Sequence, residues 1–231
     1  MDRTVKVCDK VMYIMATILA NGRPTVRRRI ALIAALAVGW LPAVCTPSEV
    51  LDVAPEGIQA ILTKPGLQVT GAKRPDVTIV EYFDYNCGFC RRMIPTFSQL
   101  LESDKKVAIV YKDWPVLGDV SVYAARCALA AQWQGKYLIA HDALLGGPRL
   151  SSDAVVESVL AQAGVDVDKL KKDLDAHAKE ISAFLARNDA EAHALTLEGT
   201  PGIVVGSKLM PGGAELPFIQ NLVAEARAGS R

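Results

Sequence analysis

The pair Cys87 and Cys90 constrains this chain more than any other feature, because of where it falls. A strand-like run over 77–83 precedes the pair, and a helix-like run over 91–101 follows it. Two cysteines three residues apart on the first turn of a helix lie on the same side, close enough for a short disulfide. The first also lies where free backbone N–H groups and the helix dipole stabilise a thiolate. The pattern therefore predicts a thiol–disulfide exchange site.

Metal binding and haem attachment are the competing interpretations of this pair. A structural zinc site needs four ligands, usually with a second closely spaced pair. The other cysteines and histidines are scattered: Cys8, Cys45, Cys127, His141, His177 and His193. A c-type haem would need His after the second cysteine, and position 91 is Arg. We therefore expect redox chemistry with no metal and no cofactor, Cys127 as a buried core thiol, and the histidines as solvated or packing residues.

Charge is divided unevenly along the chain. Residues 1–45 contain seven Lys or Arg and two acids, so the remainder carries 19 basic and 23 acidic residues. This mildly acidic body shows no basic patch with interleaved aromatic residues. Nucleic acid is therefore not expected as a partner.

The basic cluster near the N-terminus is typical of a targeting segment. Arg27-Arg28-Arg29 precedes an apolar run over 30–41, then Pro42 and small residues, with Ala43 and Cys45 at the −3 and −1 positions of a cleavage site. A second apolar stretch upstream of the arginines is unusual for a signal peptide. We therefore expect 1–45 to be a signal peptide or, if retained, an N-terminal anchor, and the protein to be exported to the periplasm.

The first half of the body has the pattern of an α/β fold. Residues 46–75 form an N-terminal segment broken by prolines, with at most one short helix around 56–63. A strand over 77–83, a helix over 87–102 and a second apolar strand over 107–111 follow. This order predicts a parallel strand pair joined by a crossover helix.

The second half is helical from 120 to 197. Residues 151–153 are expected to cap one helix, and the apolar positions from Leu170 to Leu195 mark one long helix or two joined ones. Strands over 203–205 and 208–210, joined by a tight turn, and a helix over 216–228 complete the chain. The sheet can close only if the helical block is an insertion. The expected domain boundaries are therefore 76–117 and 194–231 for the two halves of one domain, with 118–193 as the helical insertion.

This order, with Cys87-Gly88-Phe89-Cys90 after the first strand and Thr200-Pro201 before the hairpin, resembles the thioredoxin superfamily. It is most similar to the DsbA-like group of exported thiol–disulfide oxidoreductases, over about residues 76–228. The stretch from Phe83 to Cys90 is similar to the DsbA/ScsC-type branch. The resemblance implies a thioredoxin fold, βαβ…ββα, with an inserted helical domain.

The resemblance also implies roles for five residues. Cys87 would be the attacking nucleophile, and Cys90 the resolving thiol that releases a mixed disulfide. Glu81 matches a buried acid that takes the proton from Cys90. Thr200 and Pro201 match a cis-proline loop that packs against the two cysteines and pairs with extended substrate.

Glu81 also has a physical interpretation of its own. It alternates with Ile79 and Phe83, which places it on an apolar face of a strand that we expect to be central and covered on both sides. A carboxylate there should have a raised pKa. The alternative is a Glu that escapes to solvent at a strand end. Lys112, just after the second strand, could pair with Glu81.

Several neighbouring residues have two open interpretations. Arg91 and Arg92 either add positive potential at the site or form a solvated helix face. Tyr85 and Trp114 either belong to the core or line a groove. The sequence does not decide between these alternatives.

Together these patterns predict an exported enzyme that forms disulfides in substrate proteins by exchange through Cys87 and Cys90. Its expected partners are unfolded or misfolded proteins and a redox partner protein, in the membrane or outside it, that recharges the pair. The prolines in 46–75 disfavour an assembly stalk, so a monomer is expected. The alternatives are a disulfide isomerase or reductase of the same fold, suggested by Gly88-Phe89 and Thr200, or a non-catalytic surface or metal-handling protein.

Overall fold

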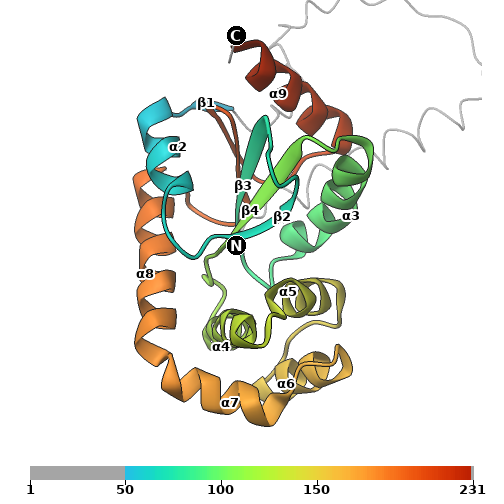
Figure 1. Ribbon diagram of the computed structural model, residues 1–231, viewed down its shortest axis with the longest axis vertical. Helices are drawn as coiled ribbons and strands as arrows, with labels where there is room; N and C mark the ends of the chain where they lie inside the picture. The colour runs from blue at the N-terminus through green and yellow to red at the C-terminus, as the bar shows by residue number, and fades with distance from the viewer. Residues whose placement is uncertain (1–49, 230–231) are drawn as a thin grey trace, which may run out of the picture. The chain divides into compact units, whose positions relative to one another are not determined.

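The computed structural model of the protein describes residues 50–229, so the predicted signal peptide or anchor over 1–45 lies outside the described residues. The described chain forms one six-stranded sheet with helices on both faces (Figure 1). The strand order across the sheet is β1-β6-β5-β3-β4-β2. The strands are β1 (Leu51–Asp52), β2 (Gln68–Gly71), β3 (Val77–Phe83), β4 (Val107–Asp113), β5 (Gly202–Val205) and β6 (Lys208–Pro211). Within residues 50–229, no helix combines the length and the apolar character needed to cross a membrane.

The central strand is β3, as predicted. It pairs parallel with β4 and antiparallel with β5. Helix α3 (Gly88–Ser103) makes the crossover between the two parallel strands. Every residue of β4 is buried, as expected for a strand that helices cover on both faces. The structure confirms the predicted α/β thioredoxin-like fold with a helical insertion.

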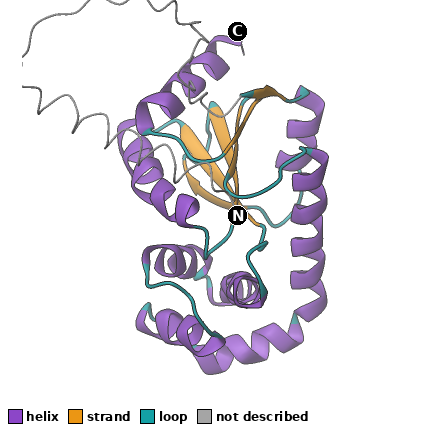
Figure 2. Ribbon diagram, turned by 180° about the vertical axis from the view of Figure 1, so that it is seen from behind, coloured by secondary structure: helices purple, strands orange, loops and turns teal. Residues whose placement is uncertain are grey.

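Alternation along β3 divides the core into two layers. Ile79 and Phe83 face α3 and α9 (Leu216–Gly229), whereas Val80 and Tyr82 face the opposite side. That second side is covered by α2 (Pro55–Leu62) and by the end of α8 (Ala178–Ala194). Figures 1 and 2 show these helix pairs on either side of the sheet. Glu81, an odd-numbered residue of β3, therefore belongs to the same layer as α3 and its cysteines.

The helical insertion gathers beyond one end of the sheet, and α8 then leads back along it (Figure 1). The predicted long helical run is two helices, α7 (Val167–Ala176) and α8, which meet at His177. Ser152 caps α6 (Asp153–Gln162) as predicted, because its hydroxyl accepts the N–H of Val155 at 3.4 Å. Cys127 is buried among alanines, as expected for a core thiol. The elements before α8 are α4 (Asp119–Ala130), η1 (Ala131–Gln134), α5 (Tyr137–Gly146), α6 (Asp153–Gln162) and α7 (Val167–Ala176).

The N-terminal segment contains more structure than the single helix predicted for it. Beside α2 it supplies both edge strands of the sheet, since β1 pairs with β6 and β2 pairs with β4, each antiparallel. These strands have two and four residues. Such short strands carry too few alternations for periodicity to reveal them, so their tertiary pairing decides them.

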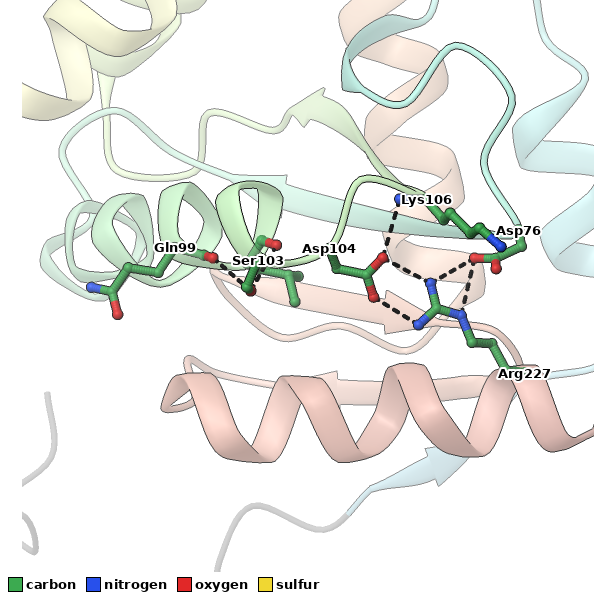
Figure 3. Close-up of polar contacts among 7 residues, drawn as sticks. Asp76, Gln99, Ser103, Asp104, Lys106 and Arg227 are labelled. Atoms are coloured by element: carbon green, nitrogen blue, oxygen red, sulfur yellow. Dashed lines mark hydrogen bonds and ion pairs between the residues drawn. The ribbon is translucent and has the colours of Figure 1, made fainter.

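One arginine joins three elements at the end of the sheet where β3 begins. The guanidinium of Arg227 on α9 donates to Asp104 at 2.7 and 3.0 Å and to Asp76 at 2.7 and 3.1 Å (Figure 3). Asp76 directly precedes β3, and Asp104 ends α3. This cluster fastens the C-terminal helix to the first half of the sheet, opposite the end where the cysteines lie.

Candidate active site

Cys87 is the N-cap of α3, and its sulfur takes part in two short-range contacts. The Sγ accepts the backbone N–H of Cys90 at 3.4 Å. In its protonated form, the Cys87 thiol also donates to the carbonyl oxygen of Thr200 at 3.2 Å. The fold therefore brings together three of the predicted site residues, although Thr200 lies 113 positions away along the chain.

The two thiols, both free in this structure, lie in different electrostatic surroundings. A hydrogen bond from the Cys90 thiol, supported by a hydrogen bond with Thr200 and by backbone N–H groups, lowers the pKa of Cys87 to about 6. Burial, the hydrogen bond to Cys87 and the negative charge of Glu81 raise the pKa of Cys90 far above the usual value for a thiol. At neutral pH the pair therefore holds an ionised Cys87 beside a protonated Cys90. That is the combination an attacking and a resolving thiol require.

Glu81 is buried, with only 1% of its surface exposed, so the alternative of escape to solvent is wrong. Its Oε1 has no hydrogen-bond partner among the described residues. Burial, with a further contribution from the negative charge of Cys87, raises the pKa of this carboxyl well above its usual value. Glu81 and Cys90 line one cavity of about 350 Å³. This arrangement is compatible with the proton-accepting role that remains a prediction for Glu81.

The predicted pairing of Lys112 with Glu81 is wrong. The register of β3 and β4 sets Glu81 opposite Tyr111 and Lys112 opposite Tyr82, on the other face of the sheet. The Nζ of Lys112 instead forms an ion pair with Oε2 of Glu191 on α8 at 2.8 Å. The hydroxyl of Tyr82 donates to the same oxygen at 3.3 Å. A step of one residue along a strand reverses the face, and the sequence alone does not give the register.

Thr200 and Pro201 form the loop that lies against Cys87. The peptide bond between them is cis, as the family resemblance implied. Pro201 is buried, and its carbonyl oxygen accepts the N–H of Gly212 at 2.7 Å. The loop is thus held between the start of α3 and the final hairpin. Substrate binding by its backbone stays a prediction.

Asp84 is a buried residue that the sequence patterns did not single out. Its Oδ1 accepts the N–H of Asn86 at 2.7 Å and the hydroxyl of Ser121 at 2.8 Å. Its Oδ2 accepts the N–H groups of Val116 and Leu117 at 2.8 and 2.9 Å. One carboxylate therefore ties the loop before Cys87 to the loop that follows β4. The sequence signal that could have identified Asp84 is its position, directly after an apolar strand and three residues before the first cysteine.

Arg91 joins the active-site helix to the insertion, so its interpretation as part of a solvated face is wrong. Its guanidinium donates to the carbonyl oxygens of Tyr85, Leu144, Gly147 and Pro148, at 2.6 to 3.1 Å. No sequence pattern distinguishes Arg91 from Arg92 in this respect, since both follow Cys90 on the same helix.

The neighbouring side chains divide into a solvent-facing set and a core set. Arg92 lies over the ring of Phe89 at 4.2 Å, and Phe89 itself is 54% exposed. Tyr85 and Trp114 are buried and belong to the core rather than to a groove. His141 is also buried and contacts the ring of Tyr85, which confirms a packing role.

Comparison with known proteins places this geometry in a family. Residues 78–224 match the model of the DSBA-like thioredoxin domain. A thioredoxin-like oxidoreductase from Silicibacter pomeroyi is 39% identical, with a TM-score of 0.71, over 74% of this chain and 97% of that one. The thiol-disulfide exchange protein alpha-DsbA2 from Wolbachia pipientis is 25% identical, with a TM-score of 0.68, over 74% of this chain and 94% of that one.

A similarity of a different kind connects the chain to longer proteins. The Na(+)/H(+) antiporter NhaA 1 of Salinispora arenicola is 29% identical over 167 residues, which are 71% of this chain and 25% of the antiporter. This chain thus spans about a quarter of the length of the curated antiporter relatives that it matches. Because the domain model matches and the chain has the cysteine pair and the cis-proline loop, it belongs to the DsbA-like thioredoxin-domain family of thiol–disulfide oxidoreductases.

Proposed function

We propose that the protein is an exported oxidase that forms disulfides in substrate proteins through Cys87 and Cys90. The lowered pKa of Cys87 is the observation that supports this most strongly. A stabilised thiolate favours the dithiol form, so it makes the corresponding disulfide a better oxidant. The arginines and the apolar run over 27–41 support export.

The reaction begins when a substrate thiolate attacks the sulfur of Cys87 in the Cys87–Cys90 disulfide. The bond between the two cysteines breaks, and Cys90 leaves as a thiolate that takes a proton from Glu81. A second substrate thiolate then attacks the substrate sulfur of the mixed disulfide. The substrate leaves with its new disulfide, and Cys87 leaves as the thiolate that its surroundings stabilise. A redox partner protein, in the membrane or outside it, would reoxidise the pair.

Unfolded or misfolded polypeptides are the proposed substrates. Phe89, between the two cysteines, is 54% exposed, and Leu117 and Val116 are 52% and 43% exposed on the loop that Asp84 holds near the site. Exposed apolar side chains can bind unfolded polypeptides, whose own apolar residues are not yet buried. The backbone of Thr200 would pair with the extended substrate beside Cys87.

The reduction potential of the Cys87–Cys90 pair, measured by equilibration with glutathione buffers, tests the oxidase proposal. A value near about −120 mV would support a disulfide donor. A value near about −270 mV would mean a reductant and would overturn the oxidase mechanism. The absence of any reversible two-electron transition would contradict thiol–disulfide catalysis altogether.

An isomerase or reductase is the second candidate, supported by Gly88-Phe89 between the cysteines and by Thr200 before the proline. In that mode, reduced Cys87 attacks a wrong disulfide. The isomerase branches of the family assemble through N-terminal extensions, whereas we propose a monomer here. Light scattering of the protein distinguishes the two, because a stable trimer would contradict the monomeric oxidase.

A non-catalytic surface or metal-handling protein is the third candidate. Loss of exchange activity in Cys87→Ala would count against it. Tight, stoichiometric Cu(I) binding by a protein without exchange activity would favour it.

A further inference from the structure

The cavity beside the cysteine pair reaches from the buried acid to the surface of the molecule. Strands β2, β3 and β4 and helices α3 and α5 line its volume of about 350 Å³. Glu81 and Cys90, each 1% exposed, lie at its buried end. Asp142, on α5 of the insertion, lines the same cavity and is exposed to solvent. The cavity has room for several water molecules and polar groups to bind them.

The proposed reaction requires such a connection. Each time Cys90 leaves as a thiolate, Glu81 gives up a proton and must regain one from solvent. Glu81 is nearly inaccessible, and its Oε1 has no hydrogen-bond partner among the residues that the structure describes. Proton exchange with solvent must therefore pass through the cavity, and Asp142 is the exposed carboxyl that lines it.

We infer that Asp142 is the surface proton-transfer residue of this active site and exchanges protons with Glu81 through the cavity. This inference rests on the proposed function. In the oxidase direction, the Glu81 carboxyl protonates the Cys90 thiolate and becomes a carboxylate. The Asp142 carboxyl then gives its proton through water to Glu81 and is reprotonated from solvent. When Cys90 attacks a mixed disulfide, the same protons move in the opposite direction.

Partial burial in the cavity wall raises the pKa of Asp142, which brings its proton affinity closer to that of Glu81. The negative charges of Glu81 and Asp142 both contribute, after burial, to the raised pKa of Tyr111 on β4. Asp142 also raises the pKa of Tyr85, in addition to the larger effect of burial. Both tyrosines therefore stay protonated and neutral while the two carboxyl groups exchange a proton.

The other titratable groups near Asp142 are poorly suited to the relay. His141 is 2% exposed, its ring packs against Tyr111 at 4.0 Å, and burial lowers its pKa to about 3. His141 also lines the cavity, but it stays neutral around neutral pH and so does not carry the proton as a stable imidazolium. Arg91 of α3 contacts the carboxyl end of α5 through Leu144 and Gly147, and it is not among the residues that line the cavity.

The test compares Asp142→Asn with the wild-type chain in single-turnover reduction of the Cys87–Cys90 disulfide by glutathione, followed by acid quench and mass spectrometry. We expect the Asp142→Asn rate to fall about tenfold, less than the roughly 100-fold or greater loss typical of removing a general acid itself. Added acetate, a carboxylate small enough to enter the cavity, should restore the variant's rate and leave the wild-type rate unchanged. The reduction potential should stay the same, because a relay changes rates and not equilibria.

Two further variants serve as controls. Asp142→Glu keeps the carboxyl and should retain the wild-type rate within about twofold. Asp175→Asn removes an exposed carboxyl of α7 that does not line the cavity and should have no effect. An Asp142→Asn rate equal to wild type, or a loss that acetate does not restore, would overturn the inference while leaving the proposed function intact. Absence of exchange in the wild-type protein would overturn both.

Discussion

The thiol of Cys87 lies 3.2 Å from the carbonyl oxygen of Thr200, although 113 positions separate the two residues along the chain. The contact joins the start of α3 to the loop before β5, so it unites the two halves of the sheet at the reacting sulfur. A substrate strand that paired with the backbone of this loop would therefore run directly past the nucleophile.

The ionisation of Cys87 gives the first prediction. Since its pKa is lowered to about 6, the thiolate fraction should rise as pH increases through about 6. Absorbance at 240 nm, with the Cys87→Ala curve subtracted, measures this fraction. The alkylation rate with iodoacetamide should follow the same curve. Cys127 does not interfere, because burial raises its pKa to about 12.

Cys90→Ala provides the internal control for this titration. The hydrogen bond from the Cys90 thiol is the largest cause of the lowered pKa of Cys87, so its removal should move the midpoint upward. A wild-type midpoint near the ordinary thiol value of about 8.5 would contradict the prediction.

Glu81 gives a prediction about stability and pH. Its pKa is raised in the folded protein, so the unfolded chain ionises first as pH rises above about 4.3. The folded state then binds more protons than the unfolded state, and the wild type loses stability with increasing pH until the folded pKa is passed. Relative to wild type, Glu81→Gln should therefore become more stable as pH rises above about 4.3, as measured by urea denaturation.

Glu102→Gln is the matched control, because Glu102 is an exposed residue of α3. Its stability relative to wild type should not change over the same pH range. A Glu81→Gln variant whose relative stability also stayed constant would show that the buried carboxyl titrates normally.

The ion pair of Lys112 and Glu191 gives the third prediction. The Lys112 side chain is fully buried, so Lys112→Met should lower the free energy of unfolding by about 3 kcal/mol and leave Glu191 without its cation. Adding Glu191→Leu should recover most of that loss, because the unpaired charge is then also removed. Chemical denaturation of the two variants measures both effects.

Lys169→Met is the control for that comparison. Lys169 pairs with Asp173 within α7, but its side chain is 47% exposed, so its loss should cost less than about 1 kcal/mol. If the double variant of Lys112 and Glu191 were no more stable than Lys112→Met alone, the cost would come from lost packing and not from an unpaired charge.

Arg91 gives the fourth prediction. Arg91→Ala removes the guanidinium N–H groups that donate to four carbonyl oxygens. It should lower the free energy of unfolding by about 3 kcal/mol, which is typical of hydrogen bonds to charged groups. Arg91→Lys should not restore it, because a compact ammonium cannot reproduce the planar fork. Arg92→Ala, which loses the contact with exposed Phe89, should cost less than about 1 kcal/mol. Equal losses in the two alanine variants would contradict the role assigned to Arg91.

Much of the fold could be predicted because its main elements have local patterns. The strand before Cys87, the crossover helix, the second parallel strand and the final hairpin all follow from alternation, helical spacing and turn residues. Strands β1 and β2 could not be predicted in this way, because two and four residues become strands only through pairing with β6 and β4. The burial of Glu81 was predictable because it lies inside an apolar strand.

The sequence by itself determined the chemistry of the site, since a thiol at a helix N-terminus after a strand is a local arrangement. Only the tertiary structure decided how charged residues are paired. In the folded protein, Lys112 forms an ion pair with Glu191, 79 positions away, and Arg91 donates to carbonyl oxygens up to 57 positions away. The tertiary structure also set Asp142 and Glu81 on the walls of one cavity. These choices depend on strand register and on the packing of distant helices, whereas sequence periodicity reports only which face of an element is apolar.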